Sequence, residues 1–155
     1  MTILNGKADS ATLGYLGRAL SLELSAVQLY STQAKLVESW GLTKVARKLS
    51  EEAGEELEHA NRIIGRMLAL GVAPNASQLR PVRLGHNVQE LLQYDHAFEN
   101  ELIVLYGNAV KHCISLADHD NRMFFEQLHA EERAHADGLS RWLQQLEDSN
   151  IASIT

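Results

Sequence analysis

Apolar residues recur along most of the chain at the spacing of amphipathic helices, three and four residues apart. The pattern predicts four helices, from about 9 or 10 to 39, 43 to 70, 87 to 115, and 118 or 120 to 147. Residues that commonly cap helices stand at these boundaries: Asp9, Ser10, Gly41, Gly71, Asn87, Asp118 and Asp120. The expected fold class is therefore all-α.

One stretch lacks helical periodicity, GVAPNASQLRPVRLGHN, and it holds both prolines, Pro74 and Pro81. A helix of about 28 residues is about 42 Å long, whereas the roughly 16 residues of this connection can extend over about 50 Å. The connection can therefore run the length of a bundle and leave the second and third helices parallel. The two short connections make the other sequential pairs antiparallel. This is the four-helix bundle with one long crossover that ferritin-like folds adopt.

Each predicted helix carries one acid on its apolar stripe, where aliphatic side chains are expected. These acids are Glu23, Glu56, Glu99 and Glu132. In ELEH and ERAH, Glu56 and Glu132 are followed three residues later by His59 and His135, which lie beside them on a helix surface. All four acids lie about 12 to 14 residues, or roughly 20 Å, from the predicted start of their helix. They should meet at the middle of the bundle.

Four carboxylates in an apolar interior must bind protons or cations. Two divalent ions would balance four carboxylates and two neutral imidazoles. One Glu from each of two helices, with Glu-x-x-His from the other two, is the ligand set of di-iron and di-manganese bundles. Carboxylate and imidazole ligands suit Fe²⁺ or Mn²⁺, and the lack of thiolates disfavours a structural zinc site. We predict an iron pair, for which manganese or zinc can substitute. Glu56 and Glu132 are expected to bridge the two ions, and Glu23 and Glu99 to be terminal ligands.

The chain resembles bacterioferritins over about residues 14 to 143. The matching segments are YLGRALSLELSAVQLY, WGLTKVARKL, EELEHANRIIGRML and EERAHADGL. The resemblance implies that the six residues are ligands of a ferroxidase site: Glu23, Glu56, His59, Glu99, Glu132 and His135. It also implies Fe²⁺ oxidation by dioxygen or hydrogen peroxide, and storage of ferric mineral in a shell of 24 subunits assembled from dimers. Tyr30 and Tyr106 each follow a predicted ligand, Glu23 or Glu99, by seven residues, so either is a candidate electron donor. Core packing is the favoured role of Tyr106, whereas Tyr30 matches a tyrosine near the family's metal pair.

The sequence departs from the family pattern at three places. A Met holds the family's haem between two subunits, but this chain has Leu57 there, so we predict no haem at that position. The family's interior-surface iron pair uses a His and an Asp, which Glu51 and Glu55 replace here. The tail 148 to 155 is shorter than the family's fifth helix, so a short or absent fifth helix is expected.

Several other polar residues are expected to support the site or to lie at the surface. Asp95 precedes Glu99 by one turn and is expected either to hold that ligand or to be an exposed acid. Glu126 and His129 repeat the Glu-x-x-His spacing but lie off the apolar stripe, so we expect both at the surface. Surface or supporting roles are expected for the remaining histidines: His86, His96, His112 and His119.

Composition narrows the class of protein. A length of 155 residues with 45% hydrophobic and 22% charged residues predicts one domain, 1 to 155, with the bundle at about 9 to 147. The formal charge of −6 argues against nucleic-acid binding. No apolar run is long enough for a membrane span or a secretory signal. The single cysteine, Cys113, is expected to be a small buried hydrophobe in a reducing cytoplasm.

Two other functions remain open from the sequence. One keeps the metal pair but makes the protein a peroxidase, a manganese catalase or a radical-generating enzyme. The other makes the chain a structural subunit of a mixed shell, whose partner supplies the haem.

Overall fold

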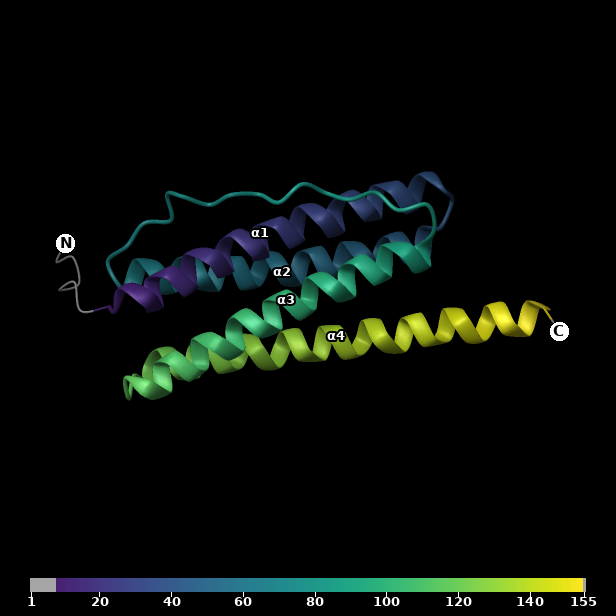
Figure 1. Ribbon diagram of the computed structural model, residues 1–155. Coiled ribbons are helices and arrows are strands. Elements are labelled where there is room, and N and C mark those ends of the chain that lie inside the picture. The colour runs from purple at the N-terminus through teal and green to yellow at the C-terminus, as the bar shows by residue number, and fades with distance from the viewer. Residues whose placement is uncertain (1–7, 155) are drawn as a thin grey trace.

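The computed structural model describes residues 8–154, and their side chains as far as residue 149. It contains four helices, α1 (Ser10–Ser39), α2 (Thr43–Ala69), α3 (Val88–Ser115) and α4 (His119–Ile154). α1 packs along α2, α3 packs along α4, and α1 also contacts α3 (Figure 1). The predicted four-helix bundle with a long crossover is confirmed. No helix among residues 8–154 is long and apolar enough to cross a membrane.

Side-chain caps fix two of the helix starts at the predicted places. The Asp9 carboxylate accepts a hydrogen bond of 3.0 Å from the backbone N–H of Thr12. The Asn87 side chain accepts one of 2.8 Å from the backbone N–H of Glu90. Each bond satisfies a backbone donor that the first turn of a helix leaves free.

A residue with positive φ lies two positions after the end of each of the first three helices. Gly41 and Gly71 take φ values of 82° and 80° after α1 and α2, as the sequence predicts. After α3 the same position is occupied by Ala117, with φ of 54°. The next residue, Asp118, donates its backbone N–H to the carbonyl of Cys113 over 2.9 Å. An alanine therefore holds a left-handed conformation that favours glycine.

The prediction that the fourth helix ends at about Glu147 was wrong, because α4 continues to Ile154. The segment DSNIASI contains neither glycine nor proline, so nothing in it stops a helix that is already propagating. Gln144 also donates a side-chain hydrogen bond of 3.1 Å to Asp148, one turn further on. The end of α4 extends past the other helices in Figure 1. No separate fifth helix occurs among the described residues.

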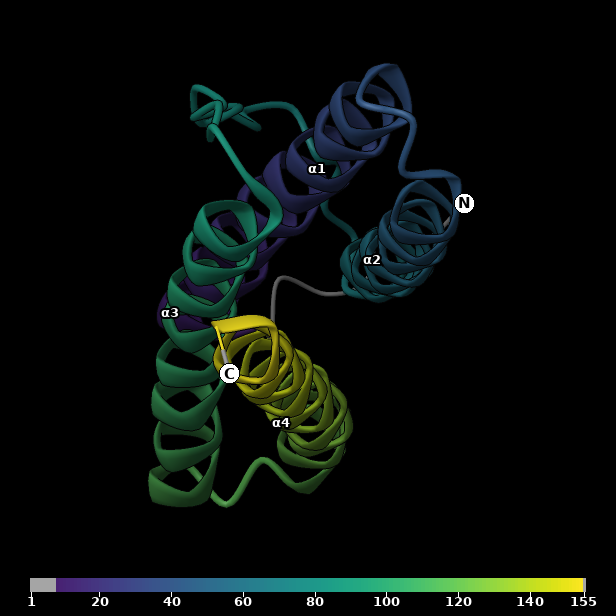
Figure 2. The ribbon, with the colours of Figure 1, turned by 90° about the vertical axis from the view of Figure 1, so that its right-hand side faces the viewer.

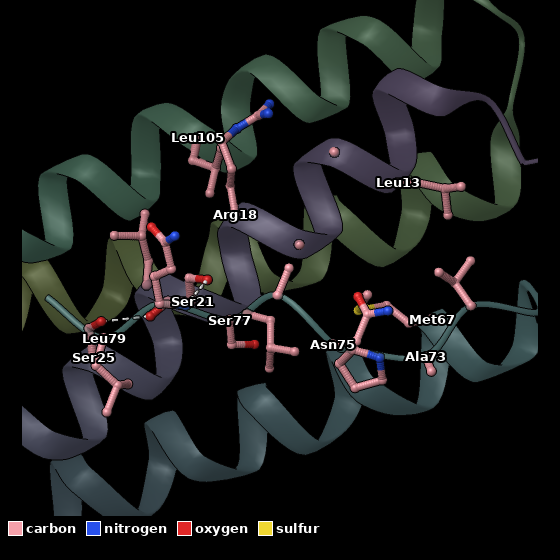
Figure 3. Close-up of a pocket in the computed structure, with 18 of the residues that line it drawn as sticks. Leu13, Arg18, Ser21, Ser25, Met67, Ala73, Asn75, Ser77, Leu79 and Leu105 are labelled. Atoms are coloured by element: carbon pink, nitrogen blue, oxygen red, sulfur yellow. Dashed lines mark hydrogen bonds between the residues drawn. The ribbon is translucent and has the colours of Figure 1, made fainter.

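The crossover between α2 and α3 runs along the α1 and α3 side of the bundle, away from α2 and α4 (Figures 1 and 2). Two serines of α1 fix it, since Ser21 and Ser25 accept the backbone N–H groups of Gln78 and Arg80 over 3.1 and 2.9 Å. A cavity of about 780 Å³ lies between the crossover and α1 (Figure 3). The crossover thus covers one face of the bundle and leaves the opposite face, formed by α2 and α4, open.

Candidate metal centre

All six predicted ligands meet in the middle of the bundle, each helix contributing at least one. The four glutamates are 0% exposed, His59 is 2% exposed, and the His135 side chain is 13% exposed. Apolar side chains such as Leu20, Ile63, Leu102 and Leu128 make up most of the remaining core. Buried acids of this kind are stable only with protons or cations beside them.

The side chains form two groups, in each of which the ligand atoms lie within 4.8 Å of one another. The first group is Glu23, Glu56, His59 and Glu132. The second group is Glu56, Glu99, Glu132 and His135. Each group therefore has one histidine and one glutamate of its own, and the two groups share Glu56 and Glu132. This arrangement fits two metal positions bridged by two carboxylates.

Both histidines direct Nδ1 toward the carboxylates. His59 Nδ1 lies 2.6 Å from Glu132 Oε1 and 3.5 Å from Glu23 Oε1. His135 Nδ1 lies 2.8 Å from Glu56 Oε1 and 3.4 Å from Glu132 Oε2. The imidazole rings stack, with centroids 5.6 Å apart and planes 14° apart. Nδ1 is thus the nitrogen of each ring that is available to a metal ion.

The polar atoms of the site are only partly satisfied by one another. Buried side-chain atoms without a hydrogen-bond partner include Glu23 Oε2, both oxygens of Glu56, Glu99 Oε2, Glu132 Oε2 and His135 Nδ1. His135 Nδ1 is close to Glu56, but the angles are not those of a hydrogen bond. Such unpaired atoms are costly in a protein interior. The chemistry and position of these donors therefore fit two divalent cations.

Burial and close contacts perturb the protonation of the site in opposite directions. Burial raises the pKa of Glu56 well above its ordinary value, and it also raises that of Glu132, beside Glu99 and Glu23. Burial alone would raise the pKa of Glu23, but close contact with His59 lowers it. For His135, burial opposes the charge, yet the nearby Glu56 carboxyl raises the pKa to about 10. Without a bound metal, these shifts favour the protonated forms of Glu56, Glu132 and His135.

The two halves of the chain repeat the same ligand spacing. Glu23, Tyr30, Glu56 and His59 in the first half correspond to Glu99, Tyr106, Glu132 and His135 in the second. Each tyrosine bonds the glutamate of the other half of the chain. Tyr30 donates a hydrogen bond to Glu99 Oε1 and Tyr106 donates one to Glu23 Oε1, both over 2.7 Å. Tyr30 lies near the site as predicted. Tyr106 is a buried core residue, as expected, and its hydroxyl also contacts a candidate ligand.

The outer nitrogen of each histidine faces an acid from the opposite Glu-x-x-His helix. His135 Nε2 lies 2.5 Å from Glu55 Oε2, and His59 Nε2 lies 3.8 Å from Glu131 Oε1. Glu131 also forms an ion pair of 2.7 Å with Arg62. Carboxylates in this position orient a ligating imidazole and fix its tautomer. We did not predict these contacts, although both acids directly precede a shared glutamate in the sequence.

A second polar cluster lies on one side of the site. Asp95 and Gln33 are 0% exposed, and none of their side-chain polar atoms has a hydrogen-bond partner. Burial raises the pKa of Asp95 well above its ordinary value, although the nearby Gln33 amide opposes this, and burial also raises the pKa of half-buried Glu52. Asp95 is therefore a buried residue near Glu99, not an exposed acid. The positions that correspond in the other half of the chain are all buried and apolar: Ala19, Ala109 and Leu128.

The other histidines, and Glu126, are exposed or half-buried. Glu126 is exposed, as predicted, and pairs with Arg122 on its own helix at 2.9 Å, while His129 is half-buried. His86 and His119 are exposed, and His96 is half-buried. His112 lies 2.5 Å from Asp9, the N-cap of α1, and thereby joins the end of α3 to the start of α1. Cys113 is buried, as predicted.

Comparisons with known proteins agree with this geometry. A family model described as a ferritin-like domain matches residues 13–149. A bacterioferritin of Rhodobacter capsulatus is 38% identical over 133 residues, which are 86% of this chain and 83% of that protein. A bacterioferritin of Brucella melitensis is 34% identical over 140 residues, which are 90% of this chain and 87% of that protein. The chain belongs to the bacterioferritin family. Family membership and the buried carboxylate and histidine groups support iron storage as its role.

A solved bacterioferritin structure gives the same result for the fold. The structure from Rhodobacter capsulatus matches with a TM-score of 0.87 and 36% sequence identity, over 92% of this chain and 89% of that one. That structure has a metal-free dinuclear site and a haem iron in a crystallographic special position. In the present chain the residue at the family's haem-ligand position is Leu57, which lies 45% exposed on α2. An aliphatic side chain has no atom that can ligate iron, so this position does not fit a haem held in the family's manner.

Proposed function

We propose that the chain is a ferroxidase subunit that oxidises Fe²⁺ at the six-residue site and delivers ferric iron to a stored mineral. The observation that carries this proposal is the pair of ligand groups that share Glu56 and Glu132. Two iron ions held on shared carboxylates can give up two electrons together. Iron is here the substrate, and dioxygen or hydrogen peroxide is the electron acceptor.

The charges of the site suit this substrate. Four carboxylates balance two Fe²⁺ ions, and one imidazole completes each position. Glu56 and Glu132 would bridge the ions, whereas Glu23 and Glu99 would each bind one ion. Because burial raises the pKa of Glu56 and Glu132, Fe²⁺ binding should release protons. The two irons alone supply two electrons, which with two protons would reduce dioxygen as far as hydrogen peroxide.

An acidic opening connects the site with the surface formed by α2 and α4. A cavity of about 570 Å³ there is lined by both histidines and by four acids, Glu51, Glu55, Glu58 and Glu131. A negative cavity attracts cations and raises their local concentration. We infer that Fe²⁺ enters here and that the ferric product leaves by the same face. Glu51 and Glu55 would provide an altered form of the family's interior-surface iron site.

We propose a closed shell of 24 subunits assembled from dimers, with the α2 and α4 face toward the mineral. The crossover on the opposite face is consistent with this orientation. Because Leu57 offers no haem ligand, haem in such a shell would come from a second, haem-binding subunit. Co-purification of a second ferritin-like chain that carries all the haem would support a mixed shell.

The proposal is tested by mixing metal-free protein with anaerobic Fe²⁺ and air in a stopped-flow instrument, while the ferric absorbance is followed. We expect a fast phase that saturates near two irons per chain, followed by slower growth of retained mineral. Glu56→Ala should abolish the fast phase, whereas the matched variant Glu126→Ala should keep it, because Glu126 is exposed and lies outside both ligand groups. Slow oxidation alone in the unmodified protein would refute the ferroxidase assignment. Rapid hydrogen peroxide disproportionation without iron retention would favour a catalase.

A further inference from the structure

The phenol groups of Tyr30 and Tyr106 touch the site in equivalent ways. Both residues are 0% exposed, and each donates one hydrogen bond of 2.7 Å to a candidate ligand. Tyr30 on α1 bonds Glu99 on α3, and Tyr106 on α3 bonds Glu23 on α1. Glu23 and Glu99 are the two glutamates that the ligand groups do not share. Each metal position therefore has its own tyrosine, one carboxylate away.

The hydroxyl of Tyr106 has one hydrogen-bond partner, the Glu23 carboxylate. Its ring packs against Phe125, with centroids 6.3 Å apart, and the neighbouring core is apolar. A phenylalanine would fill this space without bringing a hydroxyl group into the interior. Burying a hydroxyl is unfavourable unless it finds a partner, and the partner here is a carboxylate that can also hold a metal ion. The position thus combines an oxidisable phenol with a hydrogen-bonded proton acceptor.

We propose that Tyr106 is a second electron donor to the metal site, equivalent to Tyr30, so that two tyrosines supply one electron each. This proposal rests on the ferroxidase function proposed above. Two Fe²⁺ and two tyrosines together provide the four electrons that reduce dioxygen to two water molecules. The O–H bond of each phenol breaks, its electron goes to the metal site, and its proton passes to the hydrogen-bonded oxygen of Glu23 or Glu99. These two protons move on from the carboxylates to the reduced oxygen, and two more come from solvent, so the products are two waters and two tyrosyl radicals.

Further Fe²⁺ substrate then restores the phenols. Each tyrosyl radical takes one electron from an incoming Fe²⁺ and one proton, which gives tyrosine and Fe³⁺. The full cycle converts four Fe²⁺, one dioxygen and four protons into four Fe³⁺ and two waters. No hydrogen peroxide needs to leave the site. With neither tyrosine, the two irons alone would supply two electrons, and one hydrogen peroxide would be released for each dioxygen.

The test compares Tyr30→Phe, Tyr106→Phe and the double variant after one rapid addition of two Fe²⁺ per chain in air. Freeze-quenched samples are examined by electron paramagnetic resonance, and released hydrogen peroxide is measured. We expect each single variant to keep about half of the tyrosyl radical, and the double variant to keep none. Hydrogen peroxide release should rise from the unmodified protein through the single variants to the double variant. Ring-deuterated tyrosine should narrow the signal that remains in Tyr30→Phe.

Tyr15→Phe is the matched control, because Tyr15 also packs against Phe125, with centroids 6.5 Å apart, but belongs to neither ligand group. It should change neither the radical yield nor the peroxide yield. Mn²⁺ affinity, measured by calorimetry, should be unchanged in Tyr106→Phe, whereas a residue that only positions Glu23 would weaken it. Complete loss of the radical in Tyr30→Phe alone, or an unchanged radical and peroxide yield in Tyr106→Phe, would overturn the proposal. Absence of the fast two-iron phase in the unmodified protein would instead refute the ferroxidase function itself.

Discussion

Replacing Glu132 by Leu distinguishes two effects on the free energy of unfolding: the cost of burying the acidic site without metal, and the stabilisation that metal binding adds. Glu132 is buried, and its Oε2 has no hydrogen-bond partner. Such an unsatisfied group costs about 1 to 3 kcal/mol, and an apolar side chain of similar size removes this cost. His59 Nδ1 would lose its 2.6 Å contact with Glu132, a loss of about 1 kcal/mol. The free energy of unfolding of the metal-free protein should therefore stay equal or rise by up to about 2 kcal/mol.

Metal binding should show the opposite effect of the same substitution. A ligand at 100 times its dissociation constant stabilises a folded protein by about 2.7 kcal/mol per site, so two Mn²⁺ ions should contribute about 5 kcal/mol. For a chain of this size, about 1 kcal/mol corresponds to about 2 to 4 °C in Tm. The unmodified protein should therefore gain about 10 to 20 °C with saturating Mn²⁺. Glu132→Leu should lose most of this gain, because Glu132 belongs to both ligand groups.

The assay is thermal unfolding followed by circular dichroism at pH 7, with chelator and with Mn²⁺, at fixed protein concentration. Glu126→Leu is the matched control, because Glu126 also precedes a histidine by three residues on α4 but is exposed and pairs with Arg122. It should keep the full gain in Tm with Mn²⁺. A Glu132→Leu variant that kept that gain would show that Glu132 is not a shared metal ligand. Destabilisation of its metal-free form by several kcal/mol would show that Glu132 stabilises the fold itself.

Three further predictions follow from local features. Without metal, the free energy of unfolding measured between pH 5 and 9 should fall as the pH rises above 4.5, the ordinary pKa of Glu56. The raised pKa values of Glu56 and His135 make the folded state retain protons that the unfolded state releases. A rise of stability with pH would contradict these shifts. Ala117→Gly should raise the free energy of unfolding, measured by denaturant titration, by about 0.5 to 1 kcal/mol. Glycine relieves a backbone strain of about 1 to 2 kcal/mol at the left-handed position, and this gain exceeds the cost of the greater entropy of the unfolded chain. A loss of stability would show that Ala117 is not strained. Leu57→Met should allow added haem to give the absorption spectrum of methionine-ligated iron, and an equal spectrum with Leu57 in place would show that another residue ligates haem.

The ligand set and the helices could be predicted because both depend on spacing along single helices. One acid per apolar stripe, at the same level in each helix, is enough to place Glu23, Glu56, Glu99 and Glu132 together. The caps at Asp9 and Asn87 depend on residues within one turn, so they too can be recognised in the sequence. The role of the six residues as metal ligands stays a prediction until a metal is observed on them.

Contacts between helices could not be predicted from single-helix patterns. The bond between Tyr106 and Glu23 joins α3 to α1, and the contact between Glu55 and His135 joins α2 to α4. Both depend on how each helix is rotated about its axis, and apolar periodicity fixes that rotation only roughly. The equal spacing of Tyr30 and Tyr106 after Glu23 and Glu99 is visible in the sequence, but the partner of each hydroxyl is not. The length of α4 was missed because weak helix formers such as Asp148 and Ser149 do not stop a helix already formed.

The most direct test of the account is a crystal structure of the protein soaked anaerobically with Fe²⁺, with data collected on both sides of the iron absorption edge. We expect two strong anomalous peaks per chain, one among Glu23, Glu56, His59 and Glu132, the other among Glu56, Glu99, Glu132 and His135. Both peaks should lie within bonding distance of Glu56 and Glu132. A single peak, or iron only at the acidic cavity around Glu51 and Glu58, would contradict the two-metal site.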